Sequence, residues 1–304
     1  MKLPDETVAT CLAGLADAHG GKPALSGVRE EPSLSFEALE AATRRLSEAC
    51  AAAGIGRGDA VLMGVADGPG AFTALLGISR AAIAVPVPPM ETPESYARVI
   101  AATKAVAVVM DNRPGSALAE AAASAGLTLM TLSTDGASAG SVERPRAALE
   151  ASEPRPGDAA IYASTSGATS APKVIQLSHA SFLNSCRIFA EVAGTHSEGR
   201  SLVMMPIAHL HSLIRSSMPV LTQGGEVVWA PGFDTQNVIG WLRRFRPTYL
   251  SGVPSILRKL SDLAEGEGPF SLKQIIIGSD RVTPEDVMRL RDVFAADVIQ
   301  FYGL

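Results

Sequence analysis

The sequence predicts an α/β fold in which mostly parallel strands carry helices on both faces. Short apolar runs alternate with amphipathic segments of helical period along almost the whole chain. Hydrophobic residues make up 47% of the chain and charged residues 19%, a balance typical of a soluble globular protein. A chain of 304 residues is long enough to bury a large core in one or two domains.

Composition excludes several classes of function. The formal net charge of −5 argues against a nucleic-acid surface, which would be basic. The N-terminus lacks the basic-then-apolar order of a signal peptide, and no apolar run is long enough to span a membrane. Cys11, Cys50 and Cys186 are widely spaced and form neither a CxxC motif nor a zinc pattern. We therefore expect a cytoplasmic protein, without a metal site built from these residues.

The first series of elements predicts an α/β subdomain over residues 1–140. A helix should follow Ser35 as its N-cap and stop at Gly54. The helix that starts at Thr92 has Pro93 in its first turn. Strands are expected at 59–66, 83–88, 106–111 and 127–133, and further helices at 70–81 and 116–126.

Residues 133–158 are rich in Ser, Gly, Pro and charge, which indicates a surface connection and a boundary between subdomains. A second α/β subdomain is predicted over residues 155–304. Its strands are expected at 159–164, 201–207, 226–231, 247–254, 273–279 and 297–303. Its helices are expected at 179–194, 211–225, 235–247, 254–266 and 283–295.

The segment after the strand at 159–164 combines many hydroxyl groups with one cation. Such a loop can wrap a phosphate with backbone N–H groups and hydroxyls, while Lys173 supplies the counter-charge. An ordinary Ser/Thr turn with a surface lysine is the alternative reading. A Walker A loop, a GxGxxG dinucleotide fingerprint and a GxSxG nucleophile elbow are all absent here.

The stretch "STSGATSAPKVIQLSH", residues 164–179, resembles the phosphate-binding signature of the adenylate-forming superfamily, which includes acyl-CoA synthetases and peptide-synthetase adenylation domains. The match holds at Thr165, Ser166, Gly167, Thr169, Pro172, Lys173 and His179. The sequence departs from the pattern at Ala168, Ser170 and Val174. The resemblance implies that ATP phosphates are bound by Thr165, Ser166, Gly167, Ala168, Thr169, Ser170 and Lys173. His179 begins a helix, so capping or packing is an equal alternative for it.

Two later segments extend the resemblance in the same order. Residues 202–231 look like the family segment that lines the acyl pocket, which implies pocket roles for His209, Ser212 and Ser216. His211 is a less certain pocket residue than His209. Packing is the alternative role for Ser212 and Ser216. Residues 275–303 look like the adenine-binding segment, which implies roles for Gly278, Ser279, Asp280, Tyr302 and Gly303. Asp280 as a plain turn residue and Tyr302 as a strand-end aromatic remain the alternatives.

The resemblance implies a fold and a reaction. The fold is the large N-terminal domain of adenylate-forming enzymes, with two stacked, mostly parallel sheets. The reaction is ATP-dependent activation of a carboxylic acid to an acyl-adenylate, followed by thioester formation on coenzyme A or a carrier-protein phosphopantetheine. Lys173 and His209 are the catalytic candidates, and Mg²⁺ is expected to neutralise charge.

In the family the motif continues past Tyr-Gly to a Thr and a Glu, whereas this chain ends at Leu304. We therefore expect a truncated enzyme that lacks the barrel subdomain and the C-terminal domain and is inactive alone. A catalytically degenerate homologue acting as a binding or scaffolding module is the alternative function. A nicotinamide oxidoreductase is disfavoured by the missing fingerprint. The acid and the thiol acceptor stay open.

Overall fold

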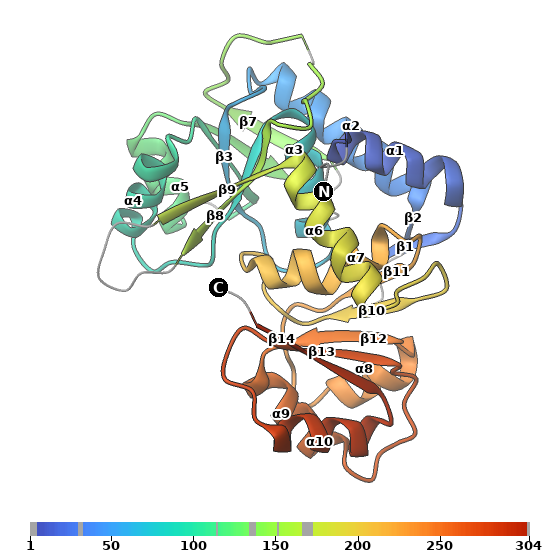
Figure 1. Ribbon diagram of the computed structural model, residues 1–304. Helices are drawn as coiled ribbons and strands as arrows, with labels where there is room; N and C mark the ends of the chain where they lie inside the picture. Colours follow the sequence, from blue (N-terminus) through green and yellow to red (C-terminus); the bar gives the residue numbers. More distant parts are fainter. Residues whose placement is uncertain are drawn as a thin grey trace. The chain divides into compact units, whose positions relative to one another are not determined.

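The computed structural model of the chain describes residues 5–29, 33–113, 115–133, 138–150, 152–165 and 173–302. The chain forms two compact units, each built on its own seven-stranded sheet (Figure 1). The first unit comprises Met1–Gly20 with Phe36–Asn184, and the second comprises Gly21–Ser35 with Ser185–Leu304. Two mostly parallel sheets with helices confirm the predicted α/β class.

The sheet of the first unit has the strand order β7-β6-β5-β3-β4-β8-β9. The four central pairs are parallel, and only the outer pairs β6–β7 and β8–β9 are antiparallel. Strands buried on both faces are continuous apolar runs, as in "AVLM" of β3. The strands are β3 (Ala60–Gly64), β4 (Ile83–Pro86), β5 (Ala107–Asp111), β6 (Thr128–Leu132), β7 (Ala139–Glu143), β8 (Ala159–Thr165) and β9 (Lys173–Ser178).

The helices of the first unit begin and end at the residues that favour such ends. Thr7 and Thr10 form a capping box at the start of the first helix. Thr92 caps the helix that has Pro93 in its first turn, and Gly54 adopts a φ of +75° just after the second helix, both as predicted. The helices are α1 (Val8–His19), α2 (Phe36–Ala52), α3 (Pro69–Ala81), α4 (Pro93–Thr103) and α5 (Ala117–Ser124). Helix α6 (His179–Val192) begins in the first unit and ends in the second.

The sheet of the second unit has the strand order β14-β13-β12-β10-β11-β1-β2. All its pairs are parallel except β1–β2. The strands are β1 (Pro23–Gly27), β2 (Leu34–Ser35), β10 (Arg200–Val203), β11 (Glu226–Trp229), β12 (Tyr249–Gly252), β13 (Gln274–Gly278) and β14 (Asp297–Phe301). The helices are the π-helix η1 (Ser212–Ser217), α7 (Met218–Leu221), α8 (Val238–Phe245), α9 (Pro254–Ala264) and α10 (Pro284–Phe294).

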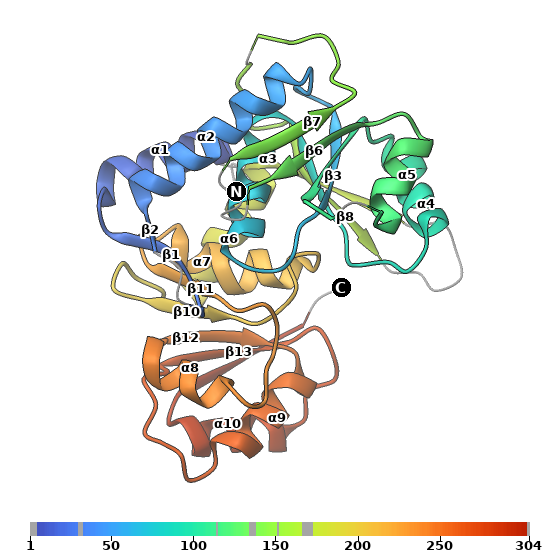
Figure 2. The ribbon, with the colours of Figure 1, turned by 180° about the vertical axis from the view of Figure 1, so that it is seen from behind.

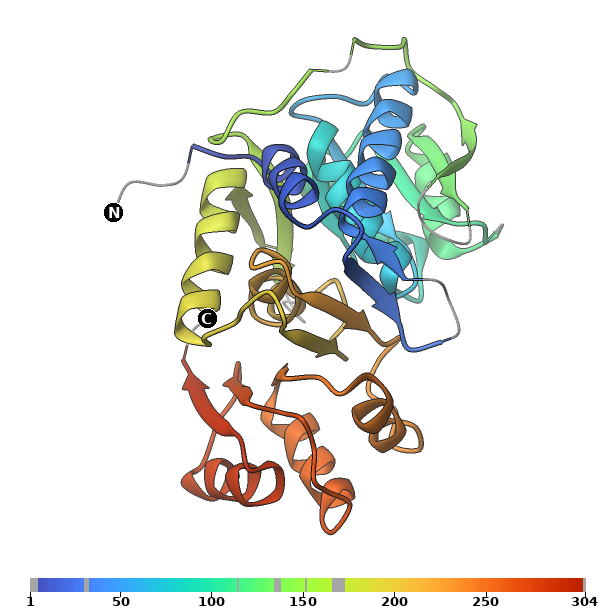
Figure 3. The same cartoon turned by 90° about the vertical axis from the view of Figure 1, so that its right-hand side faces the viewer.

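Helices α8, α9 and α10 cover one face of this second sheet (Figure 2). Alternate strand residues point to opposite faces, so Ile275 and Ile277 join the buried cluster beneath these helices. Ile276 between them packs with Tyr249 on the other face. The orange and red helices lie along that one face also when the molecule is seen from the side (Figure 3). Of the helices in the described residues, none has the length and apolar composition needed to cross a bilayer.

The division into units differs from the boundary that we predicted at residues 140–155. Strand β8 pairs with β4 through Ala84 and Ile161, so it extends the first sheet. Strand β1 pairs with β11 through Leu25 and Val227, so an N-terminal segment belongs to the second sheet. Strand hydrogen bonds connect segments that are far apart in sequence, and composition does not reveal such pairings.

Candidate active site

The predicted phosphate loop connects the two strands of an antiparallel hairpin at the edge of the first sheet. In the register of this hairpin Thr165 at the end of β8 lies opposite Lys173 at the start of β9. Residues 166–172, which include Ser166, Gly167, Ala168, Thr169 and Ser170, lie outside the described residues. Strand β9 was not predicted from the sequence. Lys173 is its first residue, and its side chain is exposed. The hairpin brings the two ends of the loop together.

The base of this hairpin is anchored by an ion pair in the first unit. The Arg57 guanidinium donates to both carboxylate oxygens of Asp158, at 2.5 Å from Nε and 2.7 Å from Nη2. These hydrogen bonds lower the pKa of Asp158 to about 2. The carbonyl of Asp158 accepts from the backbone N–H of His179, the first residue of α6. The ion pair thus fixes the point where β9 turns into α6.

His179 is fully buried and contacts the start of α1, an arrangement that fits the packing or capping alternative given for it. Its Nδ1 accepts the backbone N–H of Val8, one of the free donors at the start of α1, at 3.2 Å. Burial lowers the pKa of His179 to about 4, so the ring is neutral and carries its proton on Nε2.

In the second unit polar side chains gather where parallel strands end, the edge at which open α/β sheets bind ligands. His211 follows β10 and is only 5% exposed. Its Nε2 lies 2.8 Å from Ser251 Oγ in β12, and its Nδ1 lies 3.0 Å from Ser279 Oγ just after β13. Burial is the main cause that lowers the pKa of His211 to about 4, with smaller effects from Arg215 and His209. A neutral imidazole is therefore held in one orientation by hydroxyls from two strands.

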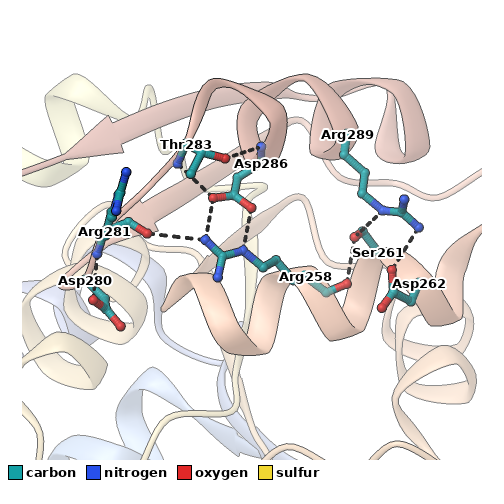
Figure 4. A network of polar contacts seen from close by, with 8 residues as sticks. All are labelled: Arg258, Ser261, Asp262, Asp280, Arg281, Thr283, Asp286 and Arg289. Carbon is teal, nitrogen blue, oxygen red and sulfur yellow. Dashed lines mark hydrogen bonds and ion pairs between the residues drawn. The ribbon is translucent and has the colours of Figure 1, made fainter.

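The turn that carries Ser279 is fixed by a polar network in the same unit (Figure 4). Ser279 adopts a left-handed φ of +66°, which is strained for a residue with a side chain. Asp286 and Thr283 form a capping box at the start of α10. Arg258 of α9 donates to both oxygens of Asp286 and also to the carbonyl of Arg281. The hydrogen bonds from Arg258 lower the pKa of Asp286 to about 2, so this clamp is charged at neutral pH.

The predicted acyl-pocket residues lie on and just before η1. Ser212 and Ser216 are buried, and their hydroxyls donate to the carbonyls of His209 and His211. The His209 ring is exposed. The structure therefore brings His211, rather than His209, into the buried network. A π-helical turn is rare and often marks a functional site.

The predicted adenine residues lie at the ends of β13 and β14. A Cβ on Gly278 would approach the carbonyl oxygen of Phe301 to 2.4 Å, so only glycine fits there. Asp280 is exposed, and its Oδ1 accepts the N–H of Arg281 at 2.7 Å. Tyr302 is 91% exposed, which leaves its ring open to stacking, and Gly303 lies outside the described residues.

Ser251, which contacts His211, and Arg215, whose charge lowers the pKa of His211, were not predicted from the sequence. A usable signal was present in "HSLIR", because His211 and Arg215 are four residues apart and share one side of a helix. For Ser251 no local signal exists, since its contact with His211 depends on the pairing of β10 with β12. In the part of the chain that the structure describes, no three His, Cys, Asp or Glu side chains cluster to hold the expected Mg²⁺.

Comparison with known proteins identifies the family. Residues 13–304 match the family described as AMP-binding enzyme. The chain belongs to the AMP-binding enzyme family. This chain is 28% identical over 275 residues to a salicylyl-CoA synthase / salicylate adenylyltransferase of Streptomyces sp, covering 83% of this chain and 50% of that protein.

A second relative is a 3-hydroxybenzoate--CoA/4-hydroxybenzoate--CoA ligase of Thauera aromatica, 28% identical over 318 residues that cover 95% of this chain and 59% of the ligase. The chain thus spans about half the length of the curated relatives that it matches. Among solved structures, VinN with L-aspartate shares the fold with a TM-score of 0.85 at 21% identity. That match covers 99% of this chain and 77% of VinN.

Proposed function

We propose that the protein containing this chain is an ATP-dependent acid–thiol ligase. A carboxylate oxygen of the acid attacks the α-phosphorus of ATP, the bond to the β-phosphate oxygen breaks, and pyrophosphate leaves with the bonding electrons. A thiol sulfur then attacks the acyl carbon, AMP leaves, and the thiol proton passes to solvent. The thiol belongs to coenzyme A or to a carrier-protein phosphopantetheine. The match of residues 13–304 to AMP-binding enzymes is the observation that carries this proposal.

The first unit binds the phosphates of ATP in this proposal, and the second unit binds the adenine and the acyl group. In the first unit Thr165, the loop 166–172 and Lys173 bind the phosphates, and the exposed ammonium of Lys173 at the loop base supports this role. In the second unit Gly278, Ser279, Asp280, Tyr302 and Gly303 bind adenine, and His209, Ser212 and Ser216 line the acyl pocket. Catalysis of this kind is mainly electrostatic placement of groups around the developing charge.

We place the protein in the cytoplasm. Cys11, Cys50 and Cys186 are buried and are not joined in disulfide bonds, a state that a reducing compartment maintains.

The test is ATP–pyrophosphate exchange with the full-length protein and a panel of carboxylic acids. Lys173→Ala and Thr169→Ala should each reduce exchange about tenfold or more, because each removes a phosphate contact. Lys259→Ala, which removes an exposed lysine on α9, is the matched control and should leave exchange unchanged. Unchanged exchange in both loop variants refutes the assigned role of the loop.

The second candidate function is that of a degenerate homologue that binds ATP without turnover, and Val174 is the residue that favours it. Val174 stands where the signature usually has Gly, and it pairs with Ser164 in the hairpin. A thermal shift with ATP separates the two candidates, since ligand at 100 times its Kd stabilises by about 2.7 kcal/mol. A thermal shift without pyrophosphate release from any acid favours the degenerate homologue.

A further inference from the structure

Arg215 of η1 is a cation without a carboxylate partner among the described residues. Its guanidinium carbon lies 3.6 Å from the ring centre of Phe301 and 5.1 Å from that of Phe189. Its Nε is buried and has no hydrogen-bond acceptor in the described part of the chain. Burial lowers the pKa of Arg215 to about 10, which leaves it protonated at neutral pH.

Other arginines of the same unit show how a satisfied guanidinium is arranged. Arg258 binds both oxygens of Asp286, and the Nε of Arg200 lies 2.6 Å from a carboxylate oxygen of Glu226. Arg215 instead lies against the rings of Phe301 and Phe189. Aromatic faces attract the cation, but they accept no hydrogen bond from the five N–H donors in the guanidinium plane. A partly buried charge with unused donors costs free energy that an oxyanion in the guanidinium plane would offset.

The position of Arg215 makes a substrate group the natural source of that oxyanion. It is four residues after His211, which is held by Ser251 and Ser279 at the carboxyl ends of β12 and β13. Phe301, which stacks on the guanidinium, is the last residue of β14. Arg215 thus lies over the sheet face on which Tyr249 and Phe301 pack, one helical turn from His211 and beside the end of β14. Ligands of open α/β sheets bind at that end of the strands.

We propose that Arg215 binds a second oxyanion on the acid substrate, so that the protein activates acids with a carboxylate or sulfonate besides the carboxylate that reacts. This inference rests on the proposed function, because it assigns the substrate class of the same ligase. The guanidinium presents a planar fork that matches a carboxylate or sulfonate with two parallel hydrogen bonds. A methyl group at the same position of the substrate leaves the fork unpaired.

Pyrophosphate release with three acids of similar length tests this assignment on the full-length protein. Succinate and 3-sulfopropionate each carry a second oxyanion, while butyrate ends in a methyl group. We expect kcat/KM for at least one dianion to exceed that for butyrate about tenfold or more. The dianion that is preferred tells whether the second group is a carboxylate or a sulfonate. Equal kcat/KM for all three acids, or a preference for butyrate, overturns the proposal.

Two substitutions separate recognition from structure. Arg215→Met should lower kcat/KM for the preferred dianion about 100-fold and leave butyrate within about threefold. Arg215→Lys keeps the charge but loses the fork, so it should fall between these values. Arg289→Met removes an arginine that pairs with Asp262 and Glu265, and it should leave both values unchanged. An equal loss for dianion and butyrate in Arg215→Met and Arg215→Lys overturns the proposal, because it indicates a structural or nucleotide contact.

Equilibrium binding of the same acids, measured by calorimetry, separates this proposal from the ligase function. If no acid releases pyrophosphate but a dianion binds more tightly than butyrate only when Arg215 is present, the ligase function fails and the anion site stands. If the dianions and butyrate bind equally, or neither binds, the proposal is overturned whatever the activity. Thermal melts of each variant confirm that it is folded.

Discussion

The two buried histidines, one in each unit, have similar pKa values but different surroundings. His179 accepts a backbone N–H at the start of α1, and its Nε2 has no partner among the described residues. His211 has hydroxyls on both nitrogens, from serines at the ends of two strands. Burial lowers the pKa of each to about 4. A lowered pKa therefore shows only that a histidine is buried. The hydrogen-bond partners distinguish a packing histidine from a histidine at a candidate site.

Acid should produce the largest effect, because both histidines are neutral in the folded chain and become protonated on unfolding. Their stabilising contribution is full above pH 6.5, the unfolded pKa, and is lost as pH falls toward 4. We expect each to lower the free energy of unfolding by about 2–3 kcal/mol between pH 6.5 and pH 4.5. Urea titrations at a series of pH values measure this loss.

His179→Gln and His211→Gln should each flatten that pH dependence by about one proton, which makes the two histidines alike in this test. A variant that keeps the wild-type slope contradicts the neutral state of its histidine. Asp158 and Asp286 do not interfere with this measurement. Because their pKa is about 2 in the folded chain, their contribution to the free energy of unfolding is lost only when pH falls below about 4.

His179→Ala should give the largest loss among the single substitutions, about 3 kcal/mol of unfolding free energy. The substitution opens a cavity at a fully buried position and leaves the Val8 N–H unpaired. Urea denaturation at pH 7.5 measures it, with the exposed His196→Ala as control at less than about 0.5 kcal/mol. Pyrophosphate release per folded molecule should not change. A loss of activity without a loss of stability would reverse the roles assigned to the two histidines.

His211→Ala should cost less stability, about 2 kcal/mol, because the serine hydroxyls that it frees can turn toward other acceptors or water. Acid activation should fall at least about tenfold, since Ser279 and the start of η1 lose their common contact. Pyrophosphate release by the full-length protein measures this. Full activity in His211→Ala contradicts a place for His211 in the site.

Ser279 offers the finest comparison. Ser279→Ala loses the hydrogen bond to His211 and keeps the left-handed backbone, so it should cost about 1 kcal/mol. Ser279→Gly loses the same bond but relieves the strain, so its free energy of unfolding should stay within about 0.5 kcal/mol of wild type. Paired urea denaturation curves distinguish them. Equal losses in the two variants would mean that the φ of +66° carries no strain.

Much of the fold could be predicted because its signals are local. Helix α10 has Thr283, Pro284 and Asp286 in a start pattern that needs no partner, and the structure has it as predicted. Strand β9 was missed because "KVIQLS" becomes a strand only through pairing with β8. Strand β1 was missed for the same reason, since its partner is β11.

In the candidate site, too, local signals could be predicted and contacts between strands could not. The phosphate signature and the strand-end residues Gly278 and Ser279 could be read from sequence order. The choice between His209 and His211 could not, because it depends on which ring turns inward against Ser251 of a neighbouring strand. Buried polar contacts across a sheet are set by register, and register is specified by the whole fold.

The pairing of β1 with β11 has a consequence for synthesis of the chain. Leu25 leaves the ribosome roughly two hundred residues before Val227, its partner in the second sheet. Until then β1 can pair only with β2, so its edge toward β11 stays open while the first unit is being made. An N-terminal deletion past residue 35 would therefore damage the later half of the protein, which a linear map of the gene would not suggest.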